Sequence, residues 1–400
     1  MAKLFPPRFP RIFNGAAAAL LGLSVASSGL ATRVAAAEPK SKTSSRSPTQ
    51  SAPADMFETH VVIKNVCAWP NLVRLKNGNL VAIVFNQPNH GLDEGDVDCW
   101  GSTDGREWKR LSTVTQHLPK TVRMNHAAGL NRNGEIVVLC NGWDKVDPQR
   151  DPKKSRPIHT VVAISRDGGV TWDRSERPAL PQVPGYSWQV PFGDIIEAAN
   201  GDLVVGTYAF GLQEDALRED AKNPTKDSHD GMRGHVYAAR SRDGGRTWDQ
   251  IAPVVKDRHV EAAMLHAGGG RWVSVSRRFT HRDLEVFVSD DDAFTWKRVG
   301  NLDLKPVSAA HLLKMSDGRI LLTYGNRKGG DRGIDARTSN DGGKTWNAPQ
   351  RLAVVSGDLG YPDALEFPGG RLLVGYYAST DPLYKGYHMG VLDLTVDKIR

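Results

Sequence analysis

The stretch "SRDGGRTWDQ" at Ser241–Gln250 decides how this chain is organised, because its outline occurs five times. A near copy, "SRDGGVTWDR", begins at Ser165, and looser copies begin at Ser102, Ser289 and Ser339. The Asp of the motif can accept backbone N–H groups, the glycines permit positive φ, and the Trp can cover the base of a hairpin. A calcium loop needs further oxygen ligands and a closing carboxylate, which these copies lack. We therefore interpret the motif as a structural turn.

A second repeated element precedes these turns. In each copy an Asn-Gly, Asp-Gly or Gly-Gly pair, or a close variant, separates two short apolar runs, as in "DGRILLTYGNR". Such a pair between apolar runs is the strongest short-range signal of a β-hairpin. The six hairpin units begin at Ala68, Asn125, Pro191, Val260, Ser308 and Tyr361.

A third strand leads into each turn motif and a fourth follows its Trp, so one unit makes a four-stranded antiparallel sheet. Six such units predict an all-β chain that folds as a six-bladed β-propeller, in which the turn motifs connect the outer strands of the blades. The orphan strand "ETHVVIKN", which begins at Glu58, and the C-terminal "YHMGVLDLTV" are expected to share one blade and close the ring.

The first 54 residues differ in composition from the rest. Basic residues precede a short alanine-rich apolar run at 16–26, and small residues follow, which is typical of a secretory signal peptide over 1–37. Residues 38–54 are rich in Ser, Pro and Lys and predict a disordered linker. We expect residues 55–400 to form the propeller domain of an exported protein, periplasmic or secreted. No cysteine near the apolar run could carry a lipid, so no membrane anchor is expected.

Charge and cysteine content exclude several classes of protein. The formal charge of +7 is concentrated in the first 54 residues, so the remaining domain is near neutral and nucleic-acid binding has no support. Cys67, Cys99 and Cys140 are too few for a disulfide framework and lack metal-ligand spacing. We expect a monomer that needs no metal or cofactor and whose partner is a carbohydrate.

The alternation of "SxDGGxTW" turns with glycine hairpins resembles the Asp-box (BNR) repeats of the sialidase superfamily, across Glu58–Arg400. The resemblance implies a sugar-cleaving site at the ends of the inner strands. There a neutral Tyr, activated by a Glu, attacks the anomeric carbon, an Asp acts as general acid and base, and three arginines hold a substrate carboxylate. Because non-enzymatic propellers also carry these repeats, the activity depends on which residues occupy the site.

Three residues match the core of that site. The segment "DLGYPDALEF" resembles the region of the family's nucleophile and assigns that role to Tyr361. A free tyrosine has a pKa near 10 and needs a base partner. The hairpin that starts "HVEAAML" brings Glu261 and Arg277 to one rim, as in the family's glutamate and second arginine.

The remaining positions match less closely. The third arginine is Arg327 or Arg332, and the acid is Asp93, with Glu94 and Asp96 as alternatives in the same loop. The first arginine of the family is missing.

Ala68 occupies the position of that first arginine, and Trp69 follows it. Trp69 and His126 are expected to contact the sugar. Further aromatic candidates for stacking on the sugar are Trp143, Trp188, Tyr208 and Phe210.

These features favour an exported glycoside hydrolase that removes a terminal, acidic sugar from a glycoconjugate or polysaccharide by a retaining mechanism. Because Ala68 occupies the position of the first arginine, a neutral sugar remains an alternative substrate. A polysaccharide lyase that uses His126 for proton transfer, and a non-catalytic propeller that binds carbohydrate or protein, are the alternatives.

Overall fold

The computed structural model describes residues 57–144, 157–212, 234–256, 258–279 and 281–400. The chain divides into two units, Met1–Ala52 and Pro53–Arg400, and the described residues all belong to the second. The predicted signal peptide and linker therefore lie outside the described residues. Within the described part every regular element is a β-strand apart from one short 3-10 helix, η1 (Val396–Lys398). No helix in this part is long and apolar enough to cross a membrane.

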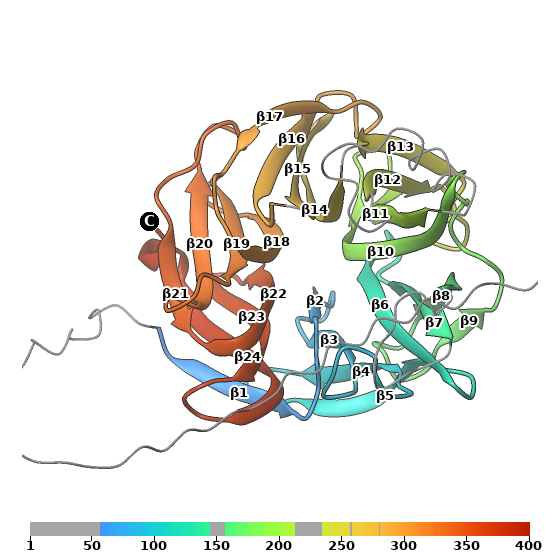
Figure 1. Cartoon of the computed structure of the whole chain (residues 1–400), viewed down its shortest axis with the longest axis horizontal. Helices are drawn as coiled ribbons and strands as arrows, with labels where there is room; N and C mark the ends of the chain where they lie inside the picture. Colours follow the sequence, from blue (N-terminus) through green and yellow to red (C-terminus); the bar gives the residue numbers. More distant parts are fainter. Residues whose placement is uncertain (1–56, 145–156, 213–233, 257, 280) are drawn as a thin grey trace, which may run out of the picture. The chain divides into compact units, whose positions relative to one another are not determined.

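The strands form five sheets (Figure 1). One four-stranded sheet contains β2 (Asn71–Arg74), β3 (Leu80–Phe85), β4 (Val97–Ser102) and β5 (Lys109–Thr115). A second contains β14 (His259–Gly268), β15 (Arg271–Arg278), β16 (Leu284–Ser289) and β17 (Lys297–Asn301). A third contains β18 (Val307–Lys314), β19 (Ile320–Asn326), β20 (Gly333–Ser339) and β21 (Gln350–Val354). Each is antiparallel, which confirms the predicted architecture of the repeat unit.

The fourth sheet joins the two ends of the described chain. It has the order β1 (Thr59–Lys64), β24 (Lys385–Thr395), β23 (Arg371–Thr380) and β22 (Ser356–Glu366). Strand β1 pairs antiparallel with β24, with Thr59 opposite Leu392. The prediction that the first strand and the C-terminal strand share one sheet is therefore confirmed.

The fifth sheet has eight strands and differs from the expected pair of separate four-stranded sheets. Its antiparallel halves are β6 (Thr121–Leu130), β7 (Ile136–Asp144), β8 (Pro157–Ser165) and β9 (Asp173–Ser175), and β10 (Tyr186–Glu197), β11 (Leu203–Leu212), β12 (His235–Ser241) and β13 (Gln250–Val255). A short parallel pairing of β6 with β10 joins them, at Ala127–Gly129 and Gly193–Ile195. At Gly129 an added Cβ would lie 2.0 Å from the Ile195 carbonyl oxygen, so only glycine permits this close approach.

The first strand of each set of four contacts the first strands of its neighbours. Strand β2 contacts β6 and β22, β10 contacts β6 and β14, and β18 contacts β14 and β22. These strands surround the centre of the domain in Figure 1, with the later strands of each set outside them. Apolar side chains fill the space between successive sets, as where Val81 and Ile83 pack with Ala128 and Val138. Because the inner strands start and end around one centre, side chains far apart in sequence meet there.

The turn motifs have the hydrogen bonds of structural turns. Asp243 Oδ1 accepts bonds from Ser241 Oγ and from the backbone N–H of Thr247, both at 2.9 Å. Its other oxygen accepts a bond from the Thr247 hydroxyl at 2.7 Å, and Trp248 Nε1 donates to the Gly245 carbonyl at 3.1 Å. All oxygens of the Asp are thus directed to its own turn, in agreement with the interpretation from sequence.

Candidate active site

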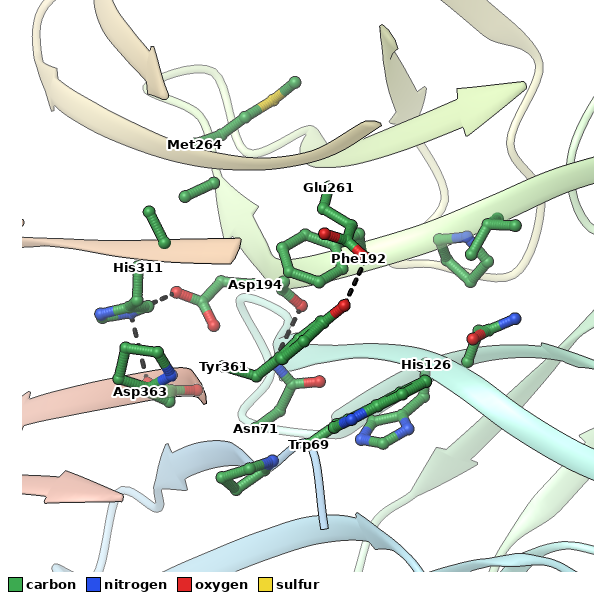
Figure 2. Close-up of a pocket in the computed structure, with 18 of the residues that line it drawn as sticks. Trp69, Asn71, His126, Phe192, Asp194, Glu261, Met264, His311, Tyr361 and Asp363 are labelled. Atoms are coloured by element: carbon green, nitrogen blue, oxygen red, sulfur yellow. Dashed lines mark hydrogen bonds and ion pairs between the residues drawn. The ribbon is translucent and has the colours of Figure 1, made fainter. Parts of the chain in front are cut away.

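A pocket lies where β10, β14, β18 and β22 meet the segment that precedes β2 (Figure 2). Its walls combine aromatic rings with acidic and imidazole side chains. The residues that line it include Trp69, His126, Phe192, Asp194, Tyr208, Glu261, His311, Tyr361 and Asp363.

Tyr361 and Glu261 are brought together although they are 100 residues apart in the chain. The Tyr361 hydroxyl donates a hydrogen bond to Glu261 Oε1, as Figure 2 shows. Arg277 Nε lies 2.5 Å from Glu261 Oε2 and holds this carboxylate in place. Burial, and then the negative charge of Glu261, raise the pKa of Tyr361 well above 10. The tyrosine is therefore neutral in the resting protein, and Glu261 is placed to take its proton when it reacts.

Three pocket residues have a backbone conformation that side-chain-bearing residues seldom adopt. Trp69, Glu261 and Tyr361 have φ values of 43°, 50° and 48°. Glu261 and Tyr361 lie at bulges, because the strand pairing skips at Val260/Ala262 and at Gly360/Asp363. Each such residue costs of order 1–3 kcal/mol, and such strain clusters at functional sites. The three positions therefore fix the geometry around the Tyr361 hydroxyl at some cost in local stability.

Trp69 covers the tyrosine. Its ring stacks on Tyr361 with centroids 5.1 Å apart and an interplanar angle of 14°, and Phe192 meets the same tyrosine edge-on at 5.8 Å. This stacking restricts the Tyr361 ring and directs its hydroxyl to Glu261. Trp69 lines the pocket as predicted from the sequence, but one face of its indole is occupied by Tyr361.

The predicted arginine clamp is not assembled in the pocket. Arg327 donates to the Leu359 carbonyl at 2.9 Å and to the Tyr377 hydroxyl at 2.8 Å, and pairs with Asp358 at 3.1 Å. Arg332 is exposed and donates to the Gly357 carbonyl. Of the two candidates from the sequence, only Arg327 lies near Tyr361. The positive charge of Arg327 offsets part of the rise in the pKa of Tyr361.

Arg277, predicted as the second arginine of the clamp, is bound to Glu261, and Ala68 is fully buried. A substrate carboxylate would therefore have to compete with existing partners for Arg277, Arg327 and Arg332.

The acidic loop before β4 does not supply the pocket with an acid. Asp93 is exposed and accepts a bond from Asn89 Nδ2 at 2.7 Å. The alternatives Glu94 and Asp96 both face His117, at 3.3 and 2.9 Å. None of the three lines the pocket. Asp93 bonds within its own loop and the other two acids bond to the segment after β5, which the spacing of the acids in the sequence could not reveal.

The same loop places His90 beside the ring of Trp69. The His90 ring lies 5.3 Å from Trp69 and pairs with Asp358, whose pKa is lowered to about 2. Burial raises this pKa, but the hydrogen bond and charge of His90 and the charge of Arg327 outweigh it. The pair of His90 and Asp358 therefore supports the stacked rings of Trp69 and Tyr361.

Sequence reasoning missed a second polar group in the pocket. His311 Nε2 lies 2.9 Å from Asp194 Oδ2 and 3.2 Å from Asp363 Oδ1. Burial lowers the pKa of His311, but the charges of Asp363 and Asp194 outweigh it and raise this pKa to about 9. Burial and the charge of Asp194 also raise the pKa of Asp363. The available signal was a single polar residue inside an apolar inner strand, as in "SAAHLL" and "PFGDII".

His126 lines the pocket but both of its ring nitrogens have partners. Nδ1 lies 2.8 Å from the Met124 carbonyl and Nε2 lies 3.0 Å from the Ile83 carbonyl. Burial lowers its pKa. An imidazole held in this way is a structural bridge between β3 and β6. It is poorly placed to transfer a proton to a ligand.

Of the other aromatic candidates, Tyr208 lines the pocket, whereas Trp143 packs in the core. The side chains of Trp188 and Phe210 lie outside the described part of the chain.

The family model of the BNR repeat-like domain matches residues 78–374. No curated protein sequence is significantly similar to the chain. Among solved structures, a protein of unknown function from Dyadobacter fermentans is 23% identical, with a TM-score of 0.68 over 86% of this chain and 98% of that one.

Two sialidases are also similar in structure. The Hadza microbial sialidase Hz136 is 20% identical, with a TM-score of 0.65 over 86% of this chain and 67% of that one. The NanB sialidase from Streptococcus pneumoniae is 12% identical, with a TM-score of 0.63 over 87% of this chain and 70% of that one. At these identities the likeness establishes the fold alone. Because the family model covers well over half of the chain, the chain belongs to the BNR repeat-like family, and the two sialidases share its fold.

Proposed function

We propose that this protein is an exported glycoside hydrolase that removes a terminal sugar by a retaining mechanism, with Tyr361 as nucleophile and Glu261 as its base. The observation that carries the proposal is the hydrogen bond from the Tyr361 hydroxyl to Glu261, with Arg277 fixing the carboxylate. We also infer that each set of four strands is one blade of a six-bladed propeller, which agrees with the contacts between successive inner strands.

The reaction would proceed in two displacements. The Tyr361 oxygen attacks the anomeric carbon while its proton passes to Glu261, and the bond to the leaving-group oxygen breaks. Water then attacks the same carbon, and the departing tyrosine recovers its proton from Glu261. Two inversions return the original configuration. A neutral nucleophile suits this pocket because it adds no negative charge beside Asp194 and Asp363 in the resting protein.

The charges of the pocket favour an uncharged sugar over the acidic sugar expected from the sequence. Among its described lining residues are three carboxylates, Asp194, Glu261 and Asp363, and no Lys or Arg. A substrate carboxylate would meet this negative charge, and no guanidinium among the described lining residues would offset it. The aromatic walls suit the apolar face of a pyranose ring.

The alternatives receive less support from the contacts in the pocket. A lyase that uses His126 would need a free imidazole nitrogen, and both nitrogens lie next to backbone carbonyls. A non-catalytic propeller has no need of three residues with strained backbone conformations around one hydroxyl.

The test is a panel of aryl glycosides of neutral sugars, amino sugars, uronic acids and sialic acid, assayed with the purified protein and with Tyr361→Phe. We expect turnover of a neutral or amino sugar and its loss in the variant, with circular dichroism and thermal unfolding unchanged. Turnover that survives in Tyr361→Phe would refute the nucleophile. Sugar binding in the absence of any turnover would support the non-catalytic alternative.

A further inference from the structure

A retaining hydrolase needs a group that gives a proton to the leaving oxygen and later takes one from water. The acids of the loop before β4 do not line the pocket, so the residues predicted from the sequence leave this role without an occupant there. The group formed by Asp194, His311 and Asp363, here named the acid trio, lies in the same pocket as Tyr361.

The acid trio is built from three inner strands. Asp194 is on β10, His311 on β18 and Asp363 on β22, two residues after Tyr361. One imidazole nitrogen of His311 and one carboxylate oxygen of each aspartate all lie within 4.8 Å of one another. His311 Nε2 stands between the two carboxylates, as Figure 2 shows. Phe192, two residues before Asp194, contacts the Tyr361 ring, so the trio and the nucleophile are fixed to one another through β10 and β22.

The hydrogen bonding of His311 indicates that the trio holds protons and not a metal ion. The backbone N–H of Ala364 faces His311 Nδ1 at 3.3 Å, so in the neutral form of the ring Nδ1 is the acceptor and Nε2 carries the proton. A histidine that binds a metal through Nε2 has its proton on Nδ1 and donates it to an acceptor. Here a donor faces Nδ1. Nε2–H is therefore directed at Asp194 Oδ2, and the Asp363 carboxylate lies beside it without a hydrogen bond to its Oδ1.

The two carboxylates have different surroundings. Asp363 has only 4% of its side chain exposed, and its Oδ2 accepts the Leu72 N–H at 2.8 Å. Asp194 has 25% of its side chain exposed and is the member of the trio that a ligand can reach. Burial and the charge of Asp194 raise the pKa of Asp363, so the buried carboxyl of the pair is the one that retains a proton.

We propose that Asp194 is the general acid and base of the hydrolase, and that His311 and Asp363 are positioning residues that keep a proton available to it. This role rests on the proposed function. In the first step a proton held by the acid trio passes through Asp194 to the glycosidic oxygen as its bond to the anomeric carbon breaks. In the second step Asp194 takes a proton from the attacking water as the bond between that carbon and Tyr361 breaks. Each turnover returns to the acid trio the proton that it gave up.

The experiment compares Asp194→Asn with Asp93→Asn, the competing candidate, and with Asp243→Asn, an outer-turn control. Each variant is assayed on the hydrolysed sugar of the panel with a methylumbelliferyl and with a 2,4-dinitrophenyl leaving group. For Asp194→Asn we expect kcat/KM on the methylumbelliferyl glycoside to fall about 10²–10⁴-fold. The 2,4-dinitrophenyl leaving group needs no protonation, so kcat/KM on that glycoside should fall less than tenfold. Azide should restore turnover and yield a glycosyl azide with retained configuration.

The outcomes separate the two proposals. Loss in Asp93→Asn with normal turnover in Asp194→Asn would overturn the role of Asp194 while the function of Tyr361 stands. If the wild-type protein hydrolyses no glycoside, the proposed function fails and this role fails with it.

A second measurement does not depend on turnover. In ¹⁵N-histidine NMR, the resonances of His311 are identified by their loss in His311→Gln. In the wild-type protein they should show a protonated Nε2, and Asp194→Asn should shift the pH at which they titrate. An unprotonated Nε2 would overturn the proposal in favour of a metal site. The same conclusion would follow if Zn²⁺ or Mn²⁺ raised the melting temperature and Asp194→Asn abolished this rise.

Discussion

The outer turns and the inner pocket use the same residue types in opposite ways. In the turn at Ser241 the acid, the hydroxyls and the tryptophan bond to groups at most four residues away. In the pocket, Tyr361 bonds to a residue 100 positions away, and His311 bonds to one 117 positions away. The turns are exposed and satisfied by themselves, whereas the pocket is buried, strained in its backbone and held by partners from several sheets. An acid in a turn therefore stabilises its own hairpin, and an acid in the pocket is available for chemistry.

The largest expected contrast between the two regions is in activity. Glu261→Gln should lower kcat about 10²–10⁴-fold on the glycoside that the protein hydrolyses, because the amide cannot take the Tyr361 proton. Asp243→Asn, in an outer turn, should leave kcat within twofold. Steady-state kinetics of both variants measure the difference. Equal losses in the two would show that activity depends on overall stability and not on the pocket.

A glycine pair tests the same contrast in stability. Gly360 and Gly369 both have positive φ, but an added Cβ at Gly360 would lie 2.0 Å from Ser308 Oγ, whereas at Gly369 nothing lies within 4 Å. Gly360→Ala should cost about 2–4 kcal/mol in the free energy of unfolding, from overpacking plus backbone strain, and Gly369→Ala about 1 kcal/mol from strain alone. Urea unfolding measures both. A larger loss at Gly369 would contradict the packing around Tyr361.

The acid trio predicts how stability changes with pH. The folded-state pKa of His311 is raised from 6.5 to about 9, so its contribution is fully present below pH 6.5 and is lost as the pH rises to 9. The raised pKa of Asp363 acts in the same direction. Asp194 and Asp363 are the charged groups that face His311, from β10 and β22.

Between pH 6.5 and 9 the wild-type protein should therefore lose about 1–3 kcal/mol more stability than His311→Gln. Urea unfolding at several pH values measures this. A variant with the same pH dependence as the wild type would show that His311 does not hold the proton.

The smallest effect is expected in an outer turn. Asp341 accepts bonds from Ser339 Oγ, from the Thr345 N–H and from the Thr345 hydroxyl, at 2.9, 2.8 and 2.6 Å. Because the turn is exposed, water replaces these partners in part, and Asp341→Ala should cost about 1 kcal/mol. Thermal unfolding measures the loss, and kcat should stay unchanged. A change in kcat would contradict the separation of turn from pocket.

Much of the fold was predictable because its signals are local. The glycine pairs between apolar runs predict hairpins, and strand β1 was correctly expected beside β24. Parallel pairing between β6 and β10 was not predicted, because it depends on the close approach of Gly129 to Ile195. Tyr361, Glu261 and Arg277 were expected together and do contact one another, since each lies at the start or end of a predicted inner strand.

The sequence by itself determined the repeated turns, the hairpins and the closing strand, because hydrogen bonds within five residues and apolar periodicity specify them. The tertiary structure alone decided which acids and arginines belong to the pocket. Asp93 and Arg332 are exposed and bond outside the pocket, whereas Asp194 and His311, which no motif marks, meet in the pocket that Tyr361 lines. The physical reason is that the function of a charged side chain depends on which partners reach it first, and those partners come from strands far apart in the chain.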